Sequence, residues 1–248
     1  MNPIQFLKQQ EKEKKDFINK LAVGNDFVES FIKSSNAIGF KILFYIASRK
    51  GFNRYGKASV DISDLIKVCN ISKQNVRDNI KSIMKTILTH IDNENKTITD
   101  TVLISEAEYK LRENRLSITV QPRIKAMLQE VVRAYTVIDV KNLMRLKGKH
   151  SIKILQLLEQ MSRYSSDIPK RKHFTLDELN HLFGTKHRSY YDLVEKVLKK
   201  AKNELDNNSK LSFVYQLNDS TATTRGRPKV ESITIDVIQI KAVQLKLF

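Results

Sequence analysis

The sequence predicts an α+β, helix-rich chain whose two halves are related by internal duplication. Its 248 residues are 41% hydrophobic, which is enough apolar material for packed cores in one large or two small domains. The order of amphipathic helices and β-like stretches repeats, and so does the spacing of apolar residues. Leu43 and Leu65 lie 22 residues apart, and Leu155 and Leu179 lie 24 apart. We therefore expect a charged leader, two domains and a tail, at 1–24, 25–133, 134–240 and 241–248.

The first half begins with a helix that starts at the capping-box pair Asp26 and Glu29. A β-like stretch follows at 58–62, and Ser63 opens a brief helix that breaks at 70–72. The next helix is longer, and its apolar stripe consists of Val76, Ile80, Ile83, Met84 and Ile87.

Two strands and a helix complete the first half. The strands span 96–104 and 116–120 and are expected to form a hairpin. The second one alternates apolar and polar residues, as a half-exposed strand does. Pro122 closes it and fits the first turn of a helix over 123–133.

The second half repeats this order. A helix around 152–158 leads through a basic loop to a strand near Phe174, and Thr175 and Glu178 form a capping box for a short helix. A long helix follows, with an apolar face of Val194, Val197, Leu198, Ala201 and Leu205. The half ends in two strands, 211–217 and 230–238. Helix, strand, short helix, tight turn, long helix and hairpin is the order of a winged helix-turn-helix module. The sequence thus predicts two such domains in tandem; two unrelated α+β halves are the alternative.

The charge of the chain predicts an anionic partner. Lys and Arg outnumber Asp and Glu by 44 to 27, for a net charge of +17, and residues 141–230 hold +10 of it. The single cysteine, Cys69, is expected to be buried and excludes an intrachain disulfide, which points to a reducing, cytoplasmic location. The sequence has no stretch apolar enough to span a membrane.

The exposed faces of the two long helices and the tip of the last hairpin are the expected DNA contacts. Arg-Gly-Arg at that tip suits a narrow A·T-rich minor groove, although a tight turn that needs glycine is the alternative. Taken singly, each of these lysines is better explained as part of a solvated helix face, and the summed charge asymmetry carries the prediction. The predicted DNA-binding residues are Lys73, Gln74, Arg77, Lys81, Arg188, Ser189, Tyr190, Lys196, Lys199, Lys200, Arg225, Arg227 and Lys229.

The sequence gives no support to an enzyme. None of the five histidines belongs to a His-x-His pair or a His-Glu-x-x-His site, and the sequence has no G-x-x-x-x-G-K-[ST] loop. We therefore expect no catalytic residue, no metal and no cofactor. A DNA-binding protein remains.

Several stretches resemble the replication initiators of theta-replicating, iteron-containing plasmids, and the resemblance covers roughly residues 25–240. The stretches are 135–140, 154–158, 174–179, 191–205 and 225–227. The resemblance implies binding to direct repeats as a monomer and to an inverted operator as a dimer. It also implies that the second domain gives most of the base readout, while the first adds dimerisation. Family members open an adjacent A·T-rich segment and recruit a host initiator and the replicative helicase.

The last five residues resemble the short peptide by which bacterial proteins bind the replicative sliding clamp. Gln244 would find polar partners, and Leu245, Leu247 and Phe248 are apolar. Packing of this segment on the fold is the alternative. For the whole chain, a winged-helix transcriptional regulator is the main competing hypothesis, and a structural DNA-bridging or partition protein is another.

Overall fold

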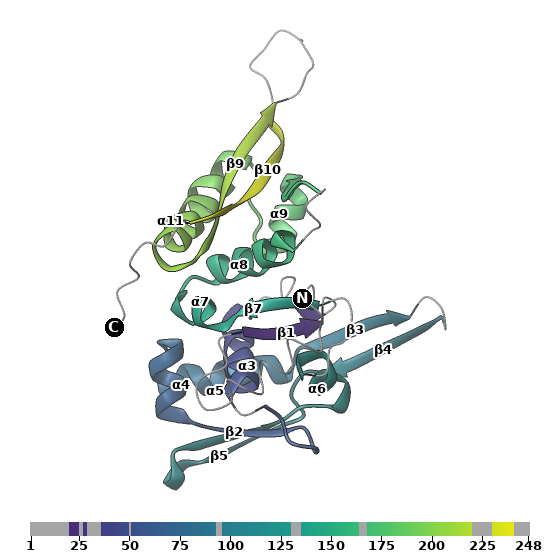
Figure 1. The fold of residues 1–248 in the computed structure, drawn as a ribbon, viewed down its shortest axis with the longest axis vertical. Coiled ribbons are helices and arrows are strands. Elements are labelled where there is room, and N and C mark those ends of the chain that lie inside the picture. The colour runs from purple at the N-terminus through teal and green to yellow at the C-terminus, as the bar shows by residue number, and fades with distance from the viewer. Residues whose placement is uncertain are drawn as a thin grey trace. The chain divides into compact units, whose positions relative to one another are not determined.

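The structure is a computed structural model that describes residues 20–24, 27–28, 36–49, 51–92, 96–129, 135–163, 168–219 and 230–240. The chain forms two compact units, residues 1–147 and 148–248 (Figure 1). The sequence pattern predicts the boundary earlier, between 133 and 134. Strand β7 follows that point but pairs with β1, near the other end of the first unit, so the segment after 134 belongs to this unit.

The first unit contains seven strands, five α-helices and a short 3₁₀ turn among the described residues. They are β1 (Lys20–Gly24), α3 (Ala37–Arg49), β2 (Lys57–Asp61), α4 (Ile62–Cys69), α5 (Lys73–Met84), β3 (Ile87–Asp92), β4 (Thr97–Val102), β5 (Glu106–Lys110), η1 (Leu111–Glu113), β6 (Arg115–Thr119), α6 (Pro122–Gln129), β7 (Tyr135–Asp139) and α7 (Val140–Arg145).

Helix α3 is the centre of the first unit, and 11 of its 13 residues are buried. Phe40 and Phe44 pack edge-on or tilted against Phe27 and each other, with ring centroids 5.6 to 6.4 Å apart. Helices α4, α5 and α7 and strands β1 and β2 all contact α3. The helix-turn-helix formed by α4 and α5 therefore rests on a helix with almost no solvent-facing side.

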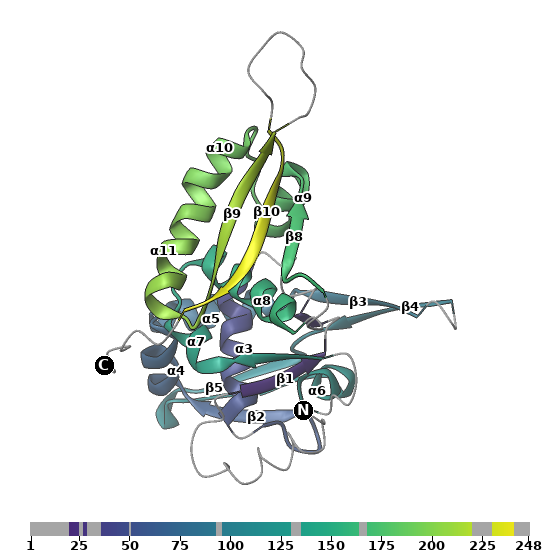
Figure 2. The same ribbon diagram turned by 45° about the horizontal axis from the view of Figure 1, so that its top comes forward.

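Three antiparallel sheets surround this core. Strands β2, β6 and β5 form one sheet in that order, β1 pairs with β7, and β3 pairs with β4. In the first sheet Ala58 lies opposite Ile118 and Val60 opposite Leu116, and all four side chains are buried. Strands β3 and β4 project from the unit as a two-stranded arm (Figures 1 and 2).

The predicted hairpin of the first half is wrong. The segment at 96–104 contributes β4, which pairs with β3, whereas 116–120 contributes β6, which lies between β2 and β5. Ile87 also leaves the predicted helix stripe: α5 ends at Met84, and Ile87 begins β3 with 59% of its surface exposed. An apolar residue at helical spacing cannot reveal where a helix stops if the strand that follows is also apolar.

The second unit is smaller and follows the predicted order. Its elements are α8 (Lys149–Ser162), β8 (Arg171–Phe174), α9 (Leu176–Phe183), α10 (Tyr190–Leu193), a π-helical segment η2 (Val194–Leu198), α11 (Lys199–Asn208), β9 (Leu211–Asp219) and β10 (Val230–Gln239). The strands form one antiparallel sheet in the order β8, β10, β9, and α11 contacts β9 (Figure 2).

The predicted capping box of the short helix is confirmed. The backbone N–H of Glu178 donates to the Thr175 hydroxyl, and the Thr175 backbone N–H donates to the Glu178 carboxylate at 2.7 Å. The hydrogen bond from the Thr175 backbone N–H, with a second one from the Thr175 hydroxyl, holds the pKa of the Glu178 carboxyl below its usual value. Gly184 ends the helix with φ +64, in the left-handed region. The other predicted box, at Asp26 and Glu29, lies outside the described residues.

Glu204 on α11 caps the N-terminus of α8. Its carboxylate accepts hydrogen bonds from the backbone N–H of Gly148 at 3.1 Å and from the hydroxyl of Ser151. A Cβ on Gly148 would lie 2.6 Å from this carboxylate, so any larger residue would displace the Glu204 side chain from this position. The carboxylate also faces the positive end of the helix dipole. The cap thus fixes the C-terminal part of the long helix against α8.

We predict that Glu204→Ala lowers the free energy of unfolding by about 1–2 kcal/mol, the typical cost of removing a helix N-cap acceptor. Thermal and denaturant unfolding would measure this change. Glu195→Ala, on the exposed side of the same long helix, is the matched control and should shift stability by less than about 1 kcal/mol. Equal losses in the two variants would contradict the capping role.

Candidate nucleic-acid interface

The first long helix presents the predicted cationic row to solvent. Ser72 caps α5 by accepting a hydrogen bond from the Asn75 N–H. Val76, Ile80 and Ile83 are buried in the unit. The opposite face carries all four predicted residues, and all four are exposed: Lys73, Gln74, Arg77 and Lys81. Local helix periodicity alone was enough to bring them together.

An acidic residue that the sequence reasoning missed shares this face. Asp78 is exposed, and its two carboxylate oxygens accept hydrogen bonds from the Gln74 amide at 3.0 and 3.1 Å. Gln74 is therefore held along the helix. A carboxylate among cations is suited to accept a hydrogen bond from the N4 amino group of cytosine in a major groove. Its i, i+4 spacing from Gln74 was visible in the sequence.

The second long helix starts at Ser189, whose hydroxyl accepts a hydrogen bond from the Asp192 N–H at 3.1 Å. Ser189 therefore serves first as a helix cap. Arg188, just before it, is exposed and makes no hydrogen bond or ion pair with any described residue. From Tyr190 to Asn208 the helix is continuous through the π-helical segment Val194–Leu198. Such segments are frequent at functional sites.

The two tyrosines at the helix start have different environments. The Tyr190 hydroxyl accepts from the backbone N–H of Leu176 at 2.9 Å and donates to the carbonyl of Glu231. It ties the start of the long helix to the start of α9 and to β10. Tyr191, in contrast, is 54% exposed. The sequence predicts Tyr190 as the groove contact; Tyr190 is half-buried, and Tyr191 is the more exposed of the two.

Two of the predicted lysines on this helix carry intrahelical ion pairs. Lys196 Nζ lies 2.8 Å from the Asp192 carboxylate, and Lys199 pairs with Glu195. The hydrogen bond from Lys196 lowers the pKa of Asp192, and the bond to Glu195 raises that of Lys199. Exposed pairs of this kind contribute only about 0–1 kcal/mol, so a phosphate can replace the carboxylate. Lys200 is exposed and has no ion pair within the described part of the chain.

A neutral histidine and a buried lysine lie behind this helix. Burial, with Lys149 as the next cause, lowers the pKa of His150 to about 4 and that of Lys153 to about 8. At neutral pH His150 is therefore uncharged, whereas Lys153 still carries its charge. His150 packs edge-on against Phe183, with ring centroids 5.4 Å apart.

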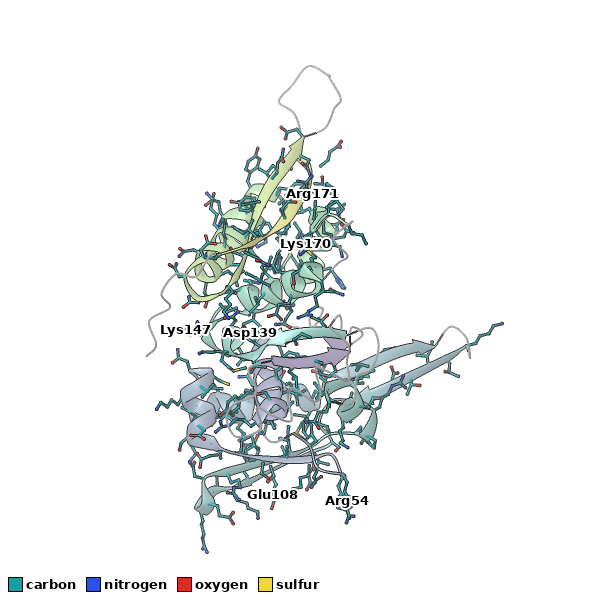
Figure 3. All side chains as sticks on the ribbon, viewed as in Figure 1. Arg54, Glu108, Asp139, Lys147, Lys170 and Arg171 are labelled. Carbon is teal, nitrogen blue, oxygen red and sulfur yellow. The ribbon has the colours of Figure 1, made fainter. Side chains whose placement is uncertain are left out.

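The charge of the basic segment at 170–172, which leads into β8, is partly neutralised. Arg171, labelled in Figure 3 beside Lys170, lies opposite Asp236 of β10, and its Nε is 2.6 Å from that carboxylate. This hydrogen bond raises the pKa of Arg171. Lys170 and Lys172 are exposed. The predicted contacts at the following hairpin tip, Arg225, Arg227 and Lys229, and the clamp peptide at 244–248, lie outside the described residues.

The first unit has a basic hairpin turn that the sequence analysis missed. It joins β5 to β6, and Asn114 closes it with φ 51 in the left-handed region. Lys110, Arg112 and Arg115 are exposed around this turn. The left-handed preference of asparagine was the available signal. The turn was missed because the strand at 116–120 was expected to pair with 96–104, whereas β6 pairs with β5.

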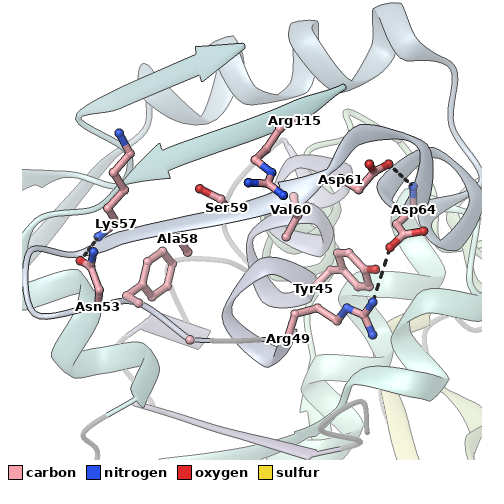
Figure 4. Close-up of a pocket in the computed structure, with 12 residues that line it drawn as sticks. Tyr45, Arg49, Asn53, Lys57, Ala58, Ser59, Val60, Asp61, Asp64 and Arg115 are labelled. Carbon is pink, nitrogen blue, oxygen red and sulfur yellow. Dashed lines mark hydrogen bonds and ion pairs between the residues drawn. The ribbon is translucent and has the colours of Figure 1, made fainter. Parts of the chain in front are cut away.

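A cavity of about 470 Å³ lies in the first unit along β2, an edge strand of its sheet (Figure 4). Its charged lining is mixed and consists of Arg49, Lys57, Asp61, Asp64 and Arg115. Arg49 pairs with Asp64 at 3.5 Å. Because its positive and negative charges nearly balance, the cavity attracts anions much less than the cationic row of α5 does.

Other site classes receive no support from the described residues. Within them, no cluster of three or more His, Cys, Asp or Glu is arranged to hold a metal ion. None of their helices is both long and apolar enough to cross a membrane. Cys69 is buried, as predicted, and burial raises the pKa of its thiol to about 11.

Each unit thus holds a buried helix, a helix-turn-helix with an exposed basic face, and a hairpin in a three-stranded sheet, which defines a tandem winged-helix protein. The family model described as "Initiator Replication protein, WH1" matches residues 20–159, and "Initiator Rep protein, WH2" matches 175–237. The chain therefore belongs to the family of initiator replication proteins. The predicted tandem winged-helix fold and the resemblance to this family are confirmed.

One of the solved structures that this chain resembles shares its fold. The Pi initiator protein, crystallised in complex with iteron DNA, matches with a TM-score of 0.71 and 13% identity over 92% of this chain and 100% of that one. Domains 2 and 3 of RctB match with a TM-score of 0.45 and 13% identity over 82% of this chain and 81% of that one. Among curated proteins, none matches this sequence.

We predict that Tyr190→Phe lowers the free energy of unfolding by about 1–3 kcal/mol, because it removes two hydrogen bonds, to Leu176 and Glu231, of about 0.5–1.5 kcal/mol each. Tyr191→Phe removes the same atom from an exposed ring and should change stability by less than about 0.5 kcal/mol. Denaturant unfolding of the two variants measures the difference. If both variants match the wild type, the hydroxyl of Tyr190 does not hold the helix start.

Proposed function

We propose that this protein initiates plasmid replication by binding directly repeated sequences in duplex DNA at an origin. The observation that supports this function most directly is the pair of helix-turn-helix units, each with a solvent-exposed basic helix. Family membership supports this function, as does the likeness to an initiator crystallised with iteron DNA. The expected finer steps are opening of an A·T-rich segment, recruitment of the host initiator and replicative helicase, and repression of its own gene as a dimer.

In this proposal the two long helices enter successive major grooves. On α5 the contacts are Lys73, Gln74, Arg77 and Lys81, to which the structure adds Asp78 as a base reader. Spaced i, i+4 along one face, the three cations of this row can reach phosphates on both sides of a groove.

In the second unit we assign phosphate contacts to Lys196, Lys199 and Lys200. Arg188 and Tyr191 at the start of the helix are the base-edge candidates, because the N-terminal residues of a recognition helix reach deepest into the groove. Ser189 caps this helix, and Tyr190 holds its start through hydrogen bonds to Leu176 and Glu231. The hairpin tip with Arg225, Arg227 and Lys229 is assigned to the adjacent minor groove.

Beyond DNA, the protein is expected to exchange between monomer and dimer and to act in the cytoplasm without a cofactor or catalytic step. The sliding clamp is a further proposed partner, through Gln244, Leu245, Leu247 and Phe248 at the end of the chain. A winged-helix transcriptional regulator remains the alternative, since its DNA-reading parts would be the same.

Selection of duplexes from a random-sequence pool, followed by footprinting on the DNA around the gene, tests the proposal. We expect one selected motif that recurs as spaced direct repeats beside an A·T-rich tract, with repeat centres in phase with the roughly 10.5 base-pair helical turn. A single palindrome would instead favour the regulator. Unspecific coating would favour a structural DNA-bridging protein and overturn sequence-specific initiation.

We predict that Lys200→Ala weakens binding to the selected duplex and lowers the slope of log affinity against log salt by about one, the value for one lost phosphate contact. Titrations at several salt concentrations would measure both. Lys210→Ala, in the exposed turn after α11, changes the net charge equally and should leave the slope unchanged. Equal slopes for the two variants would remove Lys200 from the interface.

A further inference from the structure

Each winged-helix module buries one lysine on its central helix, α3 or α8, although lysine is almost never fully buried without a partner. Lys41 on α3 is 0% exposed, and Lys153 on α8 is 1% exposed. Both begin the same tripeptide, Lys-Ile-Leu. The duplication that aligns Leu43 with Leu155 therefore places the two lysines at equivalent positions.

Both ammonium groups donate to the end of the first helix of their helix-turn-helix. Lys41 Nζ lies 3.3 Å from the carbonyl oxygen of Cys69, the last residue of α4. Lys153 Nζ lies 2.8 Å from the carbonyl oxygen of Leu182, the next-to-last residue of α9. The acceptors differ by one position along the helix, but the interaction is the same.

The chemistry of a helix end explains why a cation is placed there. The last four carbonyls of a helix lack intrahelical partners and carry the negative end of the helix dipole. Backbone caps satisfy some of them: Asn70 N–H donates to Ile66, and Gly184 N–H donates to Asn180 and His181. The lysines supply the donor for a carbonyl that these caps leave open, and a buried carbonyl without a donor is costly.

The tight turn transmits this constraint to the second helix. In the first module Asn70 is left-handed and Ser72 already caps α5, so only a few residues separate the two helices. In the second, Gly184 ends α9 and Ser189 caps α10. Fixing the last turn of the first helix therefore fixes where the second begins.

We infer that Lys41 and Lys153 are positioning residues for DNA binding, each holding the helix-turn-helix turn of its module in the geometry that presents the second helix. This inference rests on the proposed function. Lys41 also donates to the carbonyl of Leu146, at the end of α7, at 2.7 Å. In the first unit one ammonium thus joins the turn to the segment with which the unit ends.

The test compares Lys153→Met with Lys210→Met. Methionine keeps an unbranched stem of similar length but removes the charge and the donor, whereas Lys210 is exposed and away from the turn in sequence. With the duplex selected by the wild type as probe, we expect Lys153→Met to bind at least about tenfold more weakly per folded molecule, which corresponds to ~1.4 kcal/mol. Lys41→Met should repeat the effect from the first module. Equal affinities of Lys153→Met and Lys210→Met would overturn the inference.

Hydrogen exchange supplies a readout that general destabilisation would not reproduce and that needs no DNA. In Lys153→Met the amides of residues 183–191 should exchange faster, while those of β9 and β10 keep their wild-type rates. Uniform acceleration would overturn the positioning role. If Lys153→Met does not fold, Lys153→Gln replaces it, because its uncharged amide nitrogen is one atom closer to the backbone than the ammonium that reaches the Leu182 carbonyl. Wild-type binding and exchange in that variant would contradict the inference.

If the wild type selects no duplex, the proposed function fails, and the exchange experiment still decides whether Lys153 holds the turn.

Discussion

The burial of one helix on nearly every side, α3 in the first unit and α8 in the second, is the constraint on which each module depends. Such a helix has almost no solvent-facing side, so a charged side chain buried on it needs a partner inside the protein. The lysines at 41 and 153 find theirs at the end of the neighbouring helix. The two long helices with exposed basic faces, α5 and α11, contact these central helices. Their exposed faces are therefore set by packing on the other side.

The same logic separates local from tertiary information in the sequence. Caps and helix faces follow from residues a few positions apart, which is why the Thr175 box, the Gly184 stop and the basic row of α5 could be predicted. Strand pairing depends on register between distant segments, and short strands such as β4 and β6 offer several partners. The sequence therefore predicted the winged-helix order but assigned the first hairpin wrongly.

The candidate site divides in the same way. The exposure of a charged residue follows from its position in the helical repeat. The hydrogen-bond partners of a tyrosine do not follow from that position. Tyr190 and Tyr191 are adjacent and chemically identical, and only the hydroxyl partners on α9 and β10 distinguish them. The burial of Lys41 and Lys153 could not be predicted for a related reason. Lysine is expected to be exposed in any sequence pattern, and the carbonyls of Cys69 and Leu182 lie 28 and 29 residues away. The intrahelical partners of Gln74 and Lys196 lie only four residues away and follow from helix periodicity, so they were within reach of prediction.

Those neighbours change what the net charge means for binding. On both recognition helices a carboxylate stands within one turn of the cations: Asp78 on the first, Asp192 and Glu195 on the second. Each exposed pair is worth little in the free protein, so exchange for a phosphate costs little. A mispositioned duplex, however, would face those carboxylates without replacing them, and like charges repel. If these helices contact DNA as proposed, the acidic residues would lower attraction to DNA in the wrong register more than in the right one. The basic surface would then gain selectivity that its +17 charge alone would not supply.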